Sequence, residues 1–362
     1  MERVLPERIY LDHAATTPVR PEAAGAVAHG LSAWANPSSP HGEGRAARRA
    51  LEDARAAIGA AYGWTGSVLL TSGASESLAL ALDRAIAERV LISAVEHDAV
   101  YRAAASSTVL PVEPSGLLSL DALRQALDEP GRALVAVQWA NSETGVRQPI
   151  AEIAGIVQEA GHLLLIDAAQ MPAGADADVM AHADMVALSA HKRGGPPGTG
   201  ALLVRDLGLL APRGGQEFGY RPGTENLPAA LGYAAALAEP EPIERWAAMR
   251  GRLDDAIRRS DGQVVGEGFP RHTAIGSYRM PGVASAAQLI RFDLAGFAVS
   301  AGSACASGSM KPSHVLAAMG WMEAAGREVV RVSFGRETTQ DEVDAFIAAW
   351  RGIARATRSF AA

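Results

Sequence analysis

The sequence predicts an α/β protein with a large domain built on a mostly parallel sheet, followed by a smaller C-terminal α+β domain. Between residues 66 and 205, short apolar runs of strand length alternate with helical segments. This alternation is typical of parallel strands joined by helices that cover both faces of a sheet. It stops after Asn226, and the 362-residue chain exceeds the usual size of one hydrophobic core, so we expect two domains.

The strands of the main sheet are predicted from short apolar runs bounded by turn residues. A helix is expected at roughly 74–87 after the first run, and another follows the third run, where Pro149 suits a first helical turn. In chain order, the runs are GSVLLTSG, RVLISAV, ALVAVQW, HLLLID, DMVALSA and GALLVRD.

The remainder of the chain predicts the second domain. Pro240 and Pro242 divide a long helical region into two helices. TAIGSYRM and VVRVSFG are strand candidates, SAAQLIRFDL is a helix candidate, and TTQDEV has the Thr-x-x-Glu pattern that begins an amphipathic helix. We expect an N-terminal arm over 1–15, which packs against the small domain, a large domain over 16–235, and a small domain over 236–362.

Composition excludes several classes of function. Hydrophobic residues make up 48% and charged residues 20%, as in ordinary globular proteins. The net charge of −7 argues against binding to nucleic acid or to an anionic membrane. The single cysteine permits no internal disulfide and no cysteine-rich zinc site, and no metal ligands are predicted. No signal peptide or membrane-spanning run is found, and a reducing, cytoplasmic location is expected.

Polar residues follow most of the predicted strands. Ligands of open α/β sheets bind at the carboxyl ends of the strands, so these residues should meet at one rim and form a pocket for a charged ligand. They are the turn 71–77, Glu96, His97, Asn141, Asp167, Gln170, Ser189, His191 and Lys192.

The turn TSGAS (71–75) opens a predicted helix. Free N–H groups and the helix dipole at such a turn bind a phosphate, although Ser72 or Ser75 could simply serve as an N-cap. Asp167 ends an apolar strand, and its desolvated carboxylate needs a cationic partner. That partner could be a protonated ring nitrogen or an arginine.

Lys192 lies between an apolar strand and the glycine-rich segment RGGPPGTG. A partly buried lysine there can lose its proton and form a Schiff base, whereas a surface lysine is the alternative. His97 is either functional or structural. GPPGTGAL lacks the lysine and Ser/Thr of a nucleotide-binding P-loop and precedes a strand, so ATP binding is not expected.

Cys305 lies in SAGSACASGSMKP, a segment of small and hydroxylated residues. A free cysteine is more often a small buried hydrophobe. A thiol on a polar, glycine-containing loop, however, can reach a substrate as a thiolate nucleophile. We expect such a loop at about residues 300–312, from the glycine and serine content of the segment.

Together these residues resemble the cysteine desulfurases, in the branch that serves nitrogenase and iron–sulfur cluster assembly, within the fold-type I pyridoxal phosphate (PLP) enzymes. The resemblance runs nearly end to end. The motifs that carry it, in order, are YLDHAATTPV, NPSSPHGEGR, LTSGASES, EHDAV, NSETGVRQPI, DAAQ, SAHKRGGPPGTGAL, GGQEFGYRPGTEN, SAGSACASG and RVSFGRETTQDEV. It implies the fold-type I architecture, with a seven-stranded sheet.

The resemblance also implies roles for individual residues. Lys192 would hold PLP covalently, Asp167 would pair with the ring nitrogen and His97 would stack on the ring. Gln170 would bind the ring hydroxyl. The phosphate would lie against Ala74, Ser75, Ser189, His191 and the partner subunit's Thr224. Asn141 would contact both cofactor and substrate, and Arg331, rather than Arg336, would bind the substrate carboxylate.

The implied reaction converts L-cysteine to L-alanine. Cys305 would take the sulfur as a persulfide and pass it to an acceptor or cluster scaffold protein, and the enzyme would be a homodimer. The short C-terminus puts in doubt the scaffold docking that the tail of housekeeping members supports. Ser142 and Pro197 depart from the family pattern at positions without an assigned catalytic role. The alternatives are another fold-type I enzyme, such as an aminotransferase or selenocysteine lyase, and a non-catalytic assembly scaffold.

Overall fold

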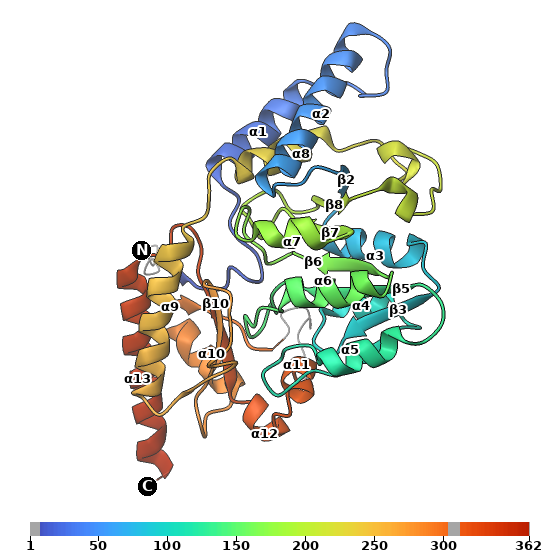
Figure 1. Cartoon of the computed structure of the whole chain (residues 1–362). Coiled ribbons are helices and arrows are strands. Elements are labelled where there is room, and N and C mark those ends of the chain that lie inside the picture. The colour runs from blue at the N-terminus through green and yellow to red at the C-terminus, as the bar shows by residue number, and fades with distance from the viewer. Residues whose placement is uncertain (1–7, 303–311, 362) are drawn as a thin grey trace.

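The computed structural model describes residues 8–302 and 312–361, and its centre is a seven-stranded sheet (Figure 1). All neighbouring pairs are parallel except those that involve β8, which runs antiparallel to both of its neighbours. The strand order is β2 (Ser67–Thr71), β8 (Gly200–Val204), β7 (Met185–Ser189), β6 (Leu163–Asp167), β5 (Ala133–Gln138), β3 (Arg89–Ser93) and β4 (Thr108–Leu110). The predicted α/β fold class with a mostly parallel sheet is therefore confirmed.

One strand of this sheet was not identified from the apolar runs. Strand β4 is three residues long, and Thr108 and Val109 are exposed, so it gives neither a long apolar run nor a buried pattern. It pairs with β3 at the edge of the sheet. The fully buried strands β5 to β8 coincide with the predicted runs because both of their faces are covered.

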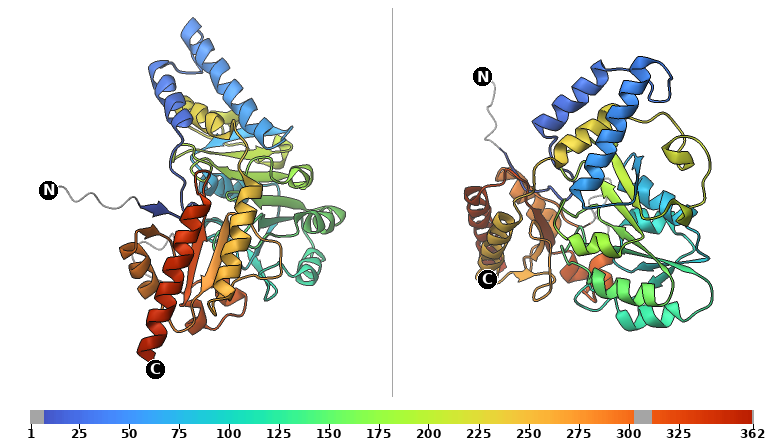
Figure 2. Two further views of the ribbon diagram at one scale, coloured as in Figure 1. Left: turned by 90° about the vertical axis from the view of Figure 1, so that its left-hand side faces the viewer. Right: turned by 45° about the horizontal axis from the view of Figure 1, so that its top comes forward.

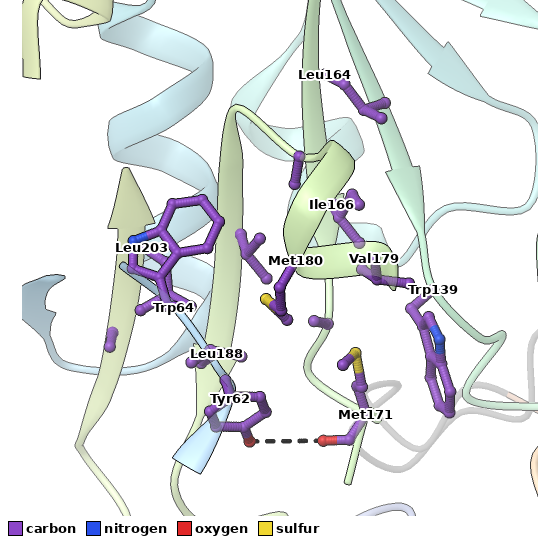
Figure 3. Packing of buried hydrophobic residues seen from close by; sticks show 14 of the residues in the cluster. Tyr62, Trp64, Trp139, Leu164, Ile166, Met171, Val179, Met180, Leu188 and Leu203 are labelled. Atoms are coloured by element: carbon purple, nitrogen blue, oxygen red, sulfur yellow. Dashed lines mark hydrogen bonds between the residues drawn. The ribbon is translucent and has the colours of Figure 1, made fainter. Parts of the chain in front are cut away.

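Side chains of successive strand residues enter two separate cores, one on each face of the sheet. In β6, Leu164 and Ile166 join one core, whereas Leu163 and Leu165 join the other. Figure 3 shows the first core, where the Tyr62 hydroxyl donates to the Met171 carbonyl at 3.5 Å. That face is covered by α2 (Gly42–Ala61), α5 (Leu120–Leu127), α6 (Ile150–Glu159) and α7 (Ala177–His182), and the other by α3 (Ala74–Arg84) and α4 (Asp98–Ala103).

Helices α1 (Pro21–Ser32), α2 (Gly42–Ala61) and α8 (Leu227–Leu237) pack together at one end of the sheet (Figure 1). The close approach of α1 to α8 requires a glycine, because a Cβ atom at Gly30 would lie 2.7 Å from the Pro228 Cα atom. The 3₁₀ segments η1 (Leu207–Leu209) and η2 (Glu217–Gly219) lie between β8 and α8.

The C-terminal part of the chain has its own core around the antiparallel sheet β12–β10–β9. Helices α9 and α13 lie side by side against it (Figure 2), and a capping box between Thr339 and Glu342 precedes α13. The elements are α9 (Ile243–Arg258), β9 (Gln263–Val264), β10 (Ile275–Arg279), α10 (Ser285–Leu294), β11 (Phe297–Ala298), α11 (His314–Ala318), α12 (Glu323–Gly326), β12 (Val329–Ser333) and α13 (Gln340–Ala361).

The N-terminal segment is tied to this C-terminal part. Strand β1 (Ile9–Tyr10) pairs with β11 in parallel, Leu11 enters the C-terminal core, and Asp12 forms a bridge with Ser333. The predicted domain boundary at residue 235 falls in the last turn of α8 and stays a prediction. Across the described chain, none of the helices combines the length and apolar character that crossing a bilayer requires.

His272 connects the two parts of the chain. Its Nδ1 accepts from the Ala274 amide at 2.9 Å, so the ring proton is on Nε2, which donates to the Gln170 carbonyl at 2.9 Å. Burial, aided by the positive charge of Arg193, lowers the pKa of His272 to about 3. The ring is therefore a neutral, fixed donor at neutral pH.

We predict that His272 makes folding stability depend on pH. Because its folded-state pKa lies below the ordinary 6.5, the unfolded chain binds the proton first. Its contribution is thus complete above pH 6.5 and is lost as the pH falls toward 3, at about 1.4 kcal/mol per pH unit. The free energy of unfolding, measured with urea at several pH values between 3 and 6.5, should therefore depend less on pH in His272→Gln than in wild type. The difference should be about that amount per pH unit. The exposed His29→Gln is the matched control, and equal slopes in His272→Gln and wild type would contradict the prediction.

Candidate active site

A cavity of about 340 Å³ lies at the carboxyl ends of the strands of the main sheet. At the rim predicted from the strand ends, residues at the ends of five strands meet, together with Ala15 of the N-terminal segment. Among the predicted site residues, those that line it are Ala74, Ser75, His97, Asp167, Gln170, Ser189, His191 and Lys192.

The start of α3 forms one wall of this cavity. Its N-cap is Gly73, with φ +148° and no side-chain cap, so the first N–H groups of the helix are not satisfied from the N-cap side chain. A Cβ atom at Gly200 would lie 2.6 Å from the Gly73 Cα atom, which shows how closely β8 supports this turn. Burial lowers the pKa of the neighbouring His191 to about 4, so it is a neutral imidazole there. The wall offers polar donors to an anion.

Asp167 forms the buried carboxylate of the cavity. It ends β6, and its Oδ1 accepts from the Ala169 amide at 2.9 Å. Burial raises the pKa of Asp167, and this hydrogen bond and the neighbouring His97 and Lys192 oppose the rise. Within residues 8–302 and 312–361, no arginine forms a salt bridge with Asp167, so the arginine partner considered from the sequence is absent there.

Lys192 follows β7 in a turn that the N-terminal segment holds. The Thr17 amide donates to the His191 carbonyl at 2.9 Å, and the Thr17 hydroxyl donates to the Lys192 carbonyl at 3.2 Å. The Lys192 amine donates to the Ala14 carbonyl, and Gln170 Nε2 donates to the same carbonyl at 3.0 Å. The Gln170 Oε1 atom is buried and has no hydrogen-bond partner within the described part of the chain.

His97 is the N-cap of α4, and its Nδ1 accepts from the Ala99 amide at 3.1 Å. This bond places the proton of a neutral ring on Nε2. His97 and Lys192 line both the first cavity and a second one beside it, of about 140 Å³. The two cavities thus adjoin at these two side chains, and a ligand in one can meet a ligand in the other.

Arg331 supplies the buried cation of the second cavity. Its Nη2 lies 2.7 Å from Asp12 Oδ1, its Nη1 donates to the Ser142 carbonyl at 2.9 Å, and its Nε has no hydrogen-bond partner among the residues that the structure describes. Arg336 does not line this cavity, and it donates instead to the carbonyls of Glu239 and Pro240. Of the two arginines considered for a carboxylate, only Arg331 is at the site.

Asn141 also lines the second cavity and is absent from the first. Its Oδ1 accepts from the amides of Glu143 and Thr144, and its Nδ2 donates to the Val95 carbonyl at 3.0 Å. Through these hydrogen bonds, the side-chain amide of Asn141 holds the turn after β5. Thr224 is exposed and does not line either cavity, and Cys305 lies outside the described residues.

Sequence reasoning missed two side chains of the second cavity region. Asp12 reaches Arg331 across 319 positions of sequence, so no local pattern identifies it. His314 lines the cavity at the start of α11. A signal for that helix was available, because Ser313 is its N-cap and accepts from the Leu316 amide at 3.1 Å.

Comparisons with a family model, with protein sequences and with solved structures give consistent results. Residues 9–346 match the model of the family described as Aminotransferase class-V. A cysteine desulfurase of Cereibacter sphaeroides is 37% identical, with 93% of each chain covered, and an IscS-like cysteine desulfurase of Mycobacterium tuberculosis is 36% identical, with 97% of each covered. A NifS-like protein from Rickettsia africae has a similar structure, with TM-score 0.84, 29% identity and coverage of 96% of this chain and 99% of that one.

We predict that the Asp12–Arg331 ion pair contributes to stability. Both side chains are mostly buried, and removal of one partner leaves an uncompensated buried charge, so Asp12→Ala should lower the free energy of unfolding by about 3 kcal/mol. Asp293→Ala, which breaks the exposed pair with Arg8, is the matched control and should cost less than about 1 kcal/mol. Urea unfolding measures both, and equal losses would refute the prediction.

Proposed function

The chain belongs to the class V aminotransferase family, among the cysteine desulfurases, and we propose that it converts L-cysteine to L-alanine and transfers the sulfur through Cys305. The observation that carries this proposal is the pair of adjoining cavities that share Lys192 and His97. One cavity suits a phosphorylated, cationic ring, and the other suits an amino acid. The sulfur would serve iron–sulfur cluster or thio-cofactor biosynthesis.

The family depends on PLP, and the first cavity fits this cofactor. Asp167 offers a buried carboxylate to a ring cation, the start of α3 offers N–H groups to a phosphate, and Lys192 lines the same cavity. Among the described residues, the buried Gln170 Oε1 has no hydrogen-bond partner, so it marks a polar position that a ligand could satisfy. Ala74, Ser75, Ser189 and His191 would hold the phosphate, and His97 and Gln170 the ring.

PLP, when bound, stabilises negative charge at the α-carbon of the amino acid. The residues of this chain supply the rest. Asp167 would pair with the ring nitrogen and favour its positive charge. Lys192 would hold the cofactor, and its amine, when free, would take the α-proton of the substrate. Arg331 binds the substrate carboxylate, beside Asn141, and so orients the α-carbon toward Lys192.

On both sides of the segment that contains Cys305, a described serine forms hydrogen bonds with a residue that lines the second cavity. On one side, Ser300 exchanges backbone hydrogen bonds with Arg331, and its hydroxyl donates to Asp12 Oδ2 at 2.7 Å. On the other side, the Ser313 hydroxyl donates to Glu143 Oε2 at 2.6 Å. This placement supports a role for the Cys305 thiolate as the nucleophile that attacks the substrate sulfur. The sulfur becomes a persulfide, and the carbon keeps the bonding electrons and is protonated to give L-alanine.

The other functions considered from the sequence make different demands. An aminotransferase would share Lys192 and Asp167 but would not need Cys305. A selenocysteine lyase would act on selenium in place of sulfur, and a non-catalytic scaffold would not need to keep the cavity residues. Side chains suited to bind a cofactor and a substrate line the two cavities, and their presence favours an enzyme.

We further propose that the protein is a homodimer in which Thr224 reaches the partner's phosphate site. Thr224 is exposed and does not line its own cavity. Near it, where α1 approaches the start of α8, Leu31 and Trp34 are 66% and 75% exposed. Large exposed apolar side chains on one face are typical of a protein interface.

Cys305→Ala tests the desulfurase activity. The variant should keep the yellow colour of bound PLP, because Cys305 is not proposed to bind the cofactor, and it should lose at least about 100-fold in sulfide release from L-cysteine, because the nucleophile is gone. Lys192→Ala is the control that should lose both. Turnover of Cys305→Ala at the wild-type rate would rule out the proposed desulfurase reaction.

A mixed dimer tests the contribution of Thr224 to the partner's site. Thr224→Val should bind PLP about tenfold more weakly, from the loss of one hydrogen bond to a charged group, and Thr224→Ser should restore binding. In a dimer of one Thr224→Val subunit and one Lys192→Ala subunit, one complete site forms if Thr224 acts across the interface. Cofactor affinity at that site should then equal wild type, whereas weakened binding would show that Thr224 acts within its own subunit.

A further inference from the structure

We propose that His314 recognises the thiol of the substrate and so distinguishes L-cysteine from amino acids without sulfur. This inference rests on the proposed function and assigns the third contact of its substrate. His314 is the first residue of α11 and lines the second cavity together with Arg331, Lys192 and His97.

The imidazole of His314 is held in place by its neighbours. Ser313, directly before it, caps α11 and is bonded to Glu143 Oε2. The ring meets the edge of the Tyr101 ring at a centroid distance of 5.5 Å and an angle of 86°. His314 Nε2 lies 2.9 Å from the Glu96 carbonyl oxygen. The backbone and the ring of His314 are therefore both held in place by neighbouring residues.

The Glu96 contact determines which ring nitrogen can act on a ligand. A carbonyl oxygen only accepts, so Nε2 of His314 carries the proton and donates it. In the neutral ring, Nδ1 then has a free lone pair that can accept from a thiol S–H, and in the charged ring its proton can pair with a thiolate.

When the amine and the carboxylate of a bound amino acid are both held, its side chain faces the part of the second cavity that contains His314. The amine goes to the cofactor at Lys192 and the carboxylate goes to Arg331, so the third substituent on the α-carbon meets the remaining lining. Two other polar side chains there are already engaged: Asn141 holds its own turn and Glu143 accepts from Ser313.

A carboxylate repels a thiolate because both are negatively charged. Besides Glu143, the described lining of the second cavity contains two acidic side chains, Glu96 and Asp98. Glu96 is completely buried, its Oε1 accepts from the Gln138 amide, and its Oε2 has no hydrogen-bond partner in the described ranges 8–302 and 312–361. Among the lining residues that the structure describes, His314 is thus the base not already assigned to the cofactor, to the carboxylate or to a turn. It is the group with the chemistry to recognise sulfur.

His314→Gln tests this assignment, because the glutamine amide can still donate to the Glu96 carbonyl but lacks the second ring nitrogen. With the holoenzyme, the KM for L-cysteine should rise about tenfold, whereas the Kd of L-alanine, read from the absorbance change of bound PLP, should stay within about twofold of wild type. L-alanine shares the amine and carboxylate and has no thiol, so it isolates the third contact. Arg331→Lys is the matched control and should weaken both ligands.

Two results would overturn the assignment. Unchanged affinity for both ligands would mean that the thiol does not meet His314, and an equal loss for both would mean that His314 only supports the cavity. His314→Asn, which keeps an acceptor near the position of Nδ1, should recover part of the L-cysteine affinity and separates recognition from packing. A wild-type enzyme that releases no sulfide from L-cysteine would instead refute the proposed function.

Discussion

The N-terminal segment from Asp12 to Thr17 joins the two cavities, and the arrangement of the site depends on it. The Ala14 carbonyl accepts from both Lys192 and Gln170, and the Ala14 amide donates to the Ser333 hydroxyl at 2.8 Å. Thr17 holds the turn of Lys192, while Asp12 holds Arg331. One short segment therefore sets the position of the amine that would carry the cofactor relative to the cation that would bind the substrate.

Burial sets the charges in the site. Glu96 and Asp167 are both buried carboxyl groups, and desolvation is the main reason that both have a raised pKa. Two neighbouring buried anions repel each other, and the charge of Asp167 raises the pKa of Glu96 further. Positive charge at Lys192 opposes the rise in the pKa of Asp167. Asp167 is therefore the buried carboxyl group suited to pair with a cationic ring.

The sequence allowed most of the main sheet and one cavity to be predicted, for identifiable physical reasons. Strands β5 to β8 are buried on both faces and so appear as apolar runs, and the rule for ligands at strand ends brought Asp167, Ser189 and Lys192 to one cavity. Strand β4 was not predicted because it is short and exposed. The contact between Asp12 and Arg331 was not predicted because it depends on the tertiary fold, which no local periodicity encodes. The role of Cys305 rests on the family resemblance and on the described residues at both ends of its segment.

The central claim is that one sulfur atom leaves L-cysteine and becomes bound to Cys305. Intact-mass spectrometry of the PLP-loaded protein, incubated with one equivalent of L-cysteine and no acceptor, tests this directly. The account predicts a mass increase of one sulfur atom that dithiothreitol removes, that peptide mapping places on Cys305, and that appears together with one equivalent of L-alanine. L-alanine formed with no sulfur on Cys305, or a protein mass unchanged after turnover, would contradict it.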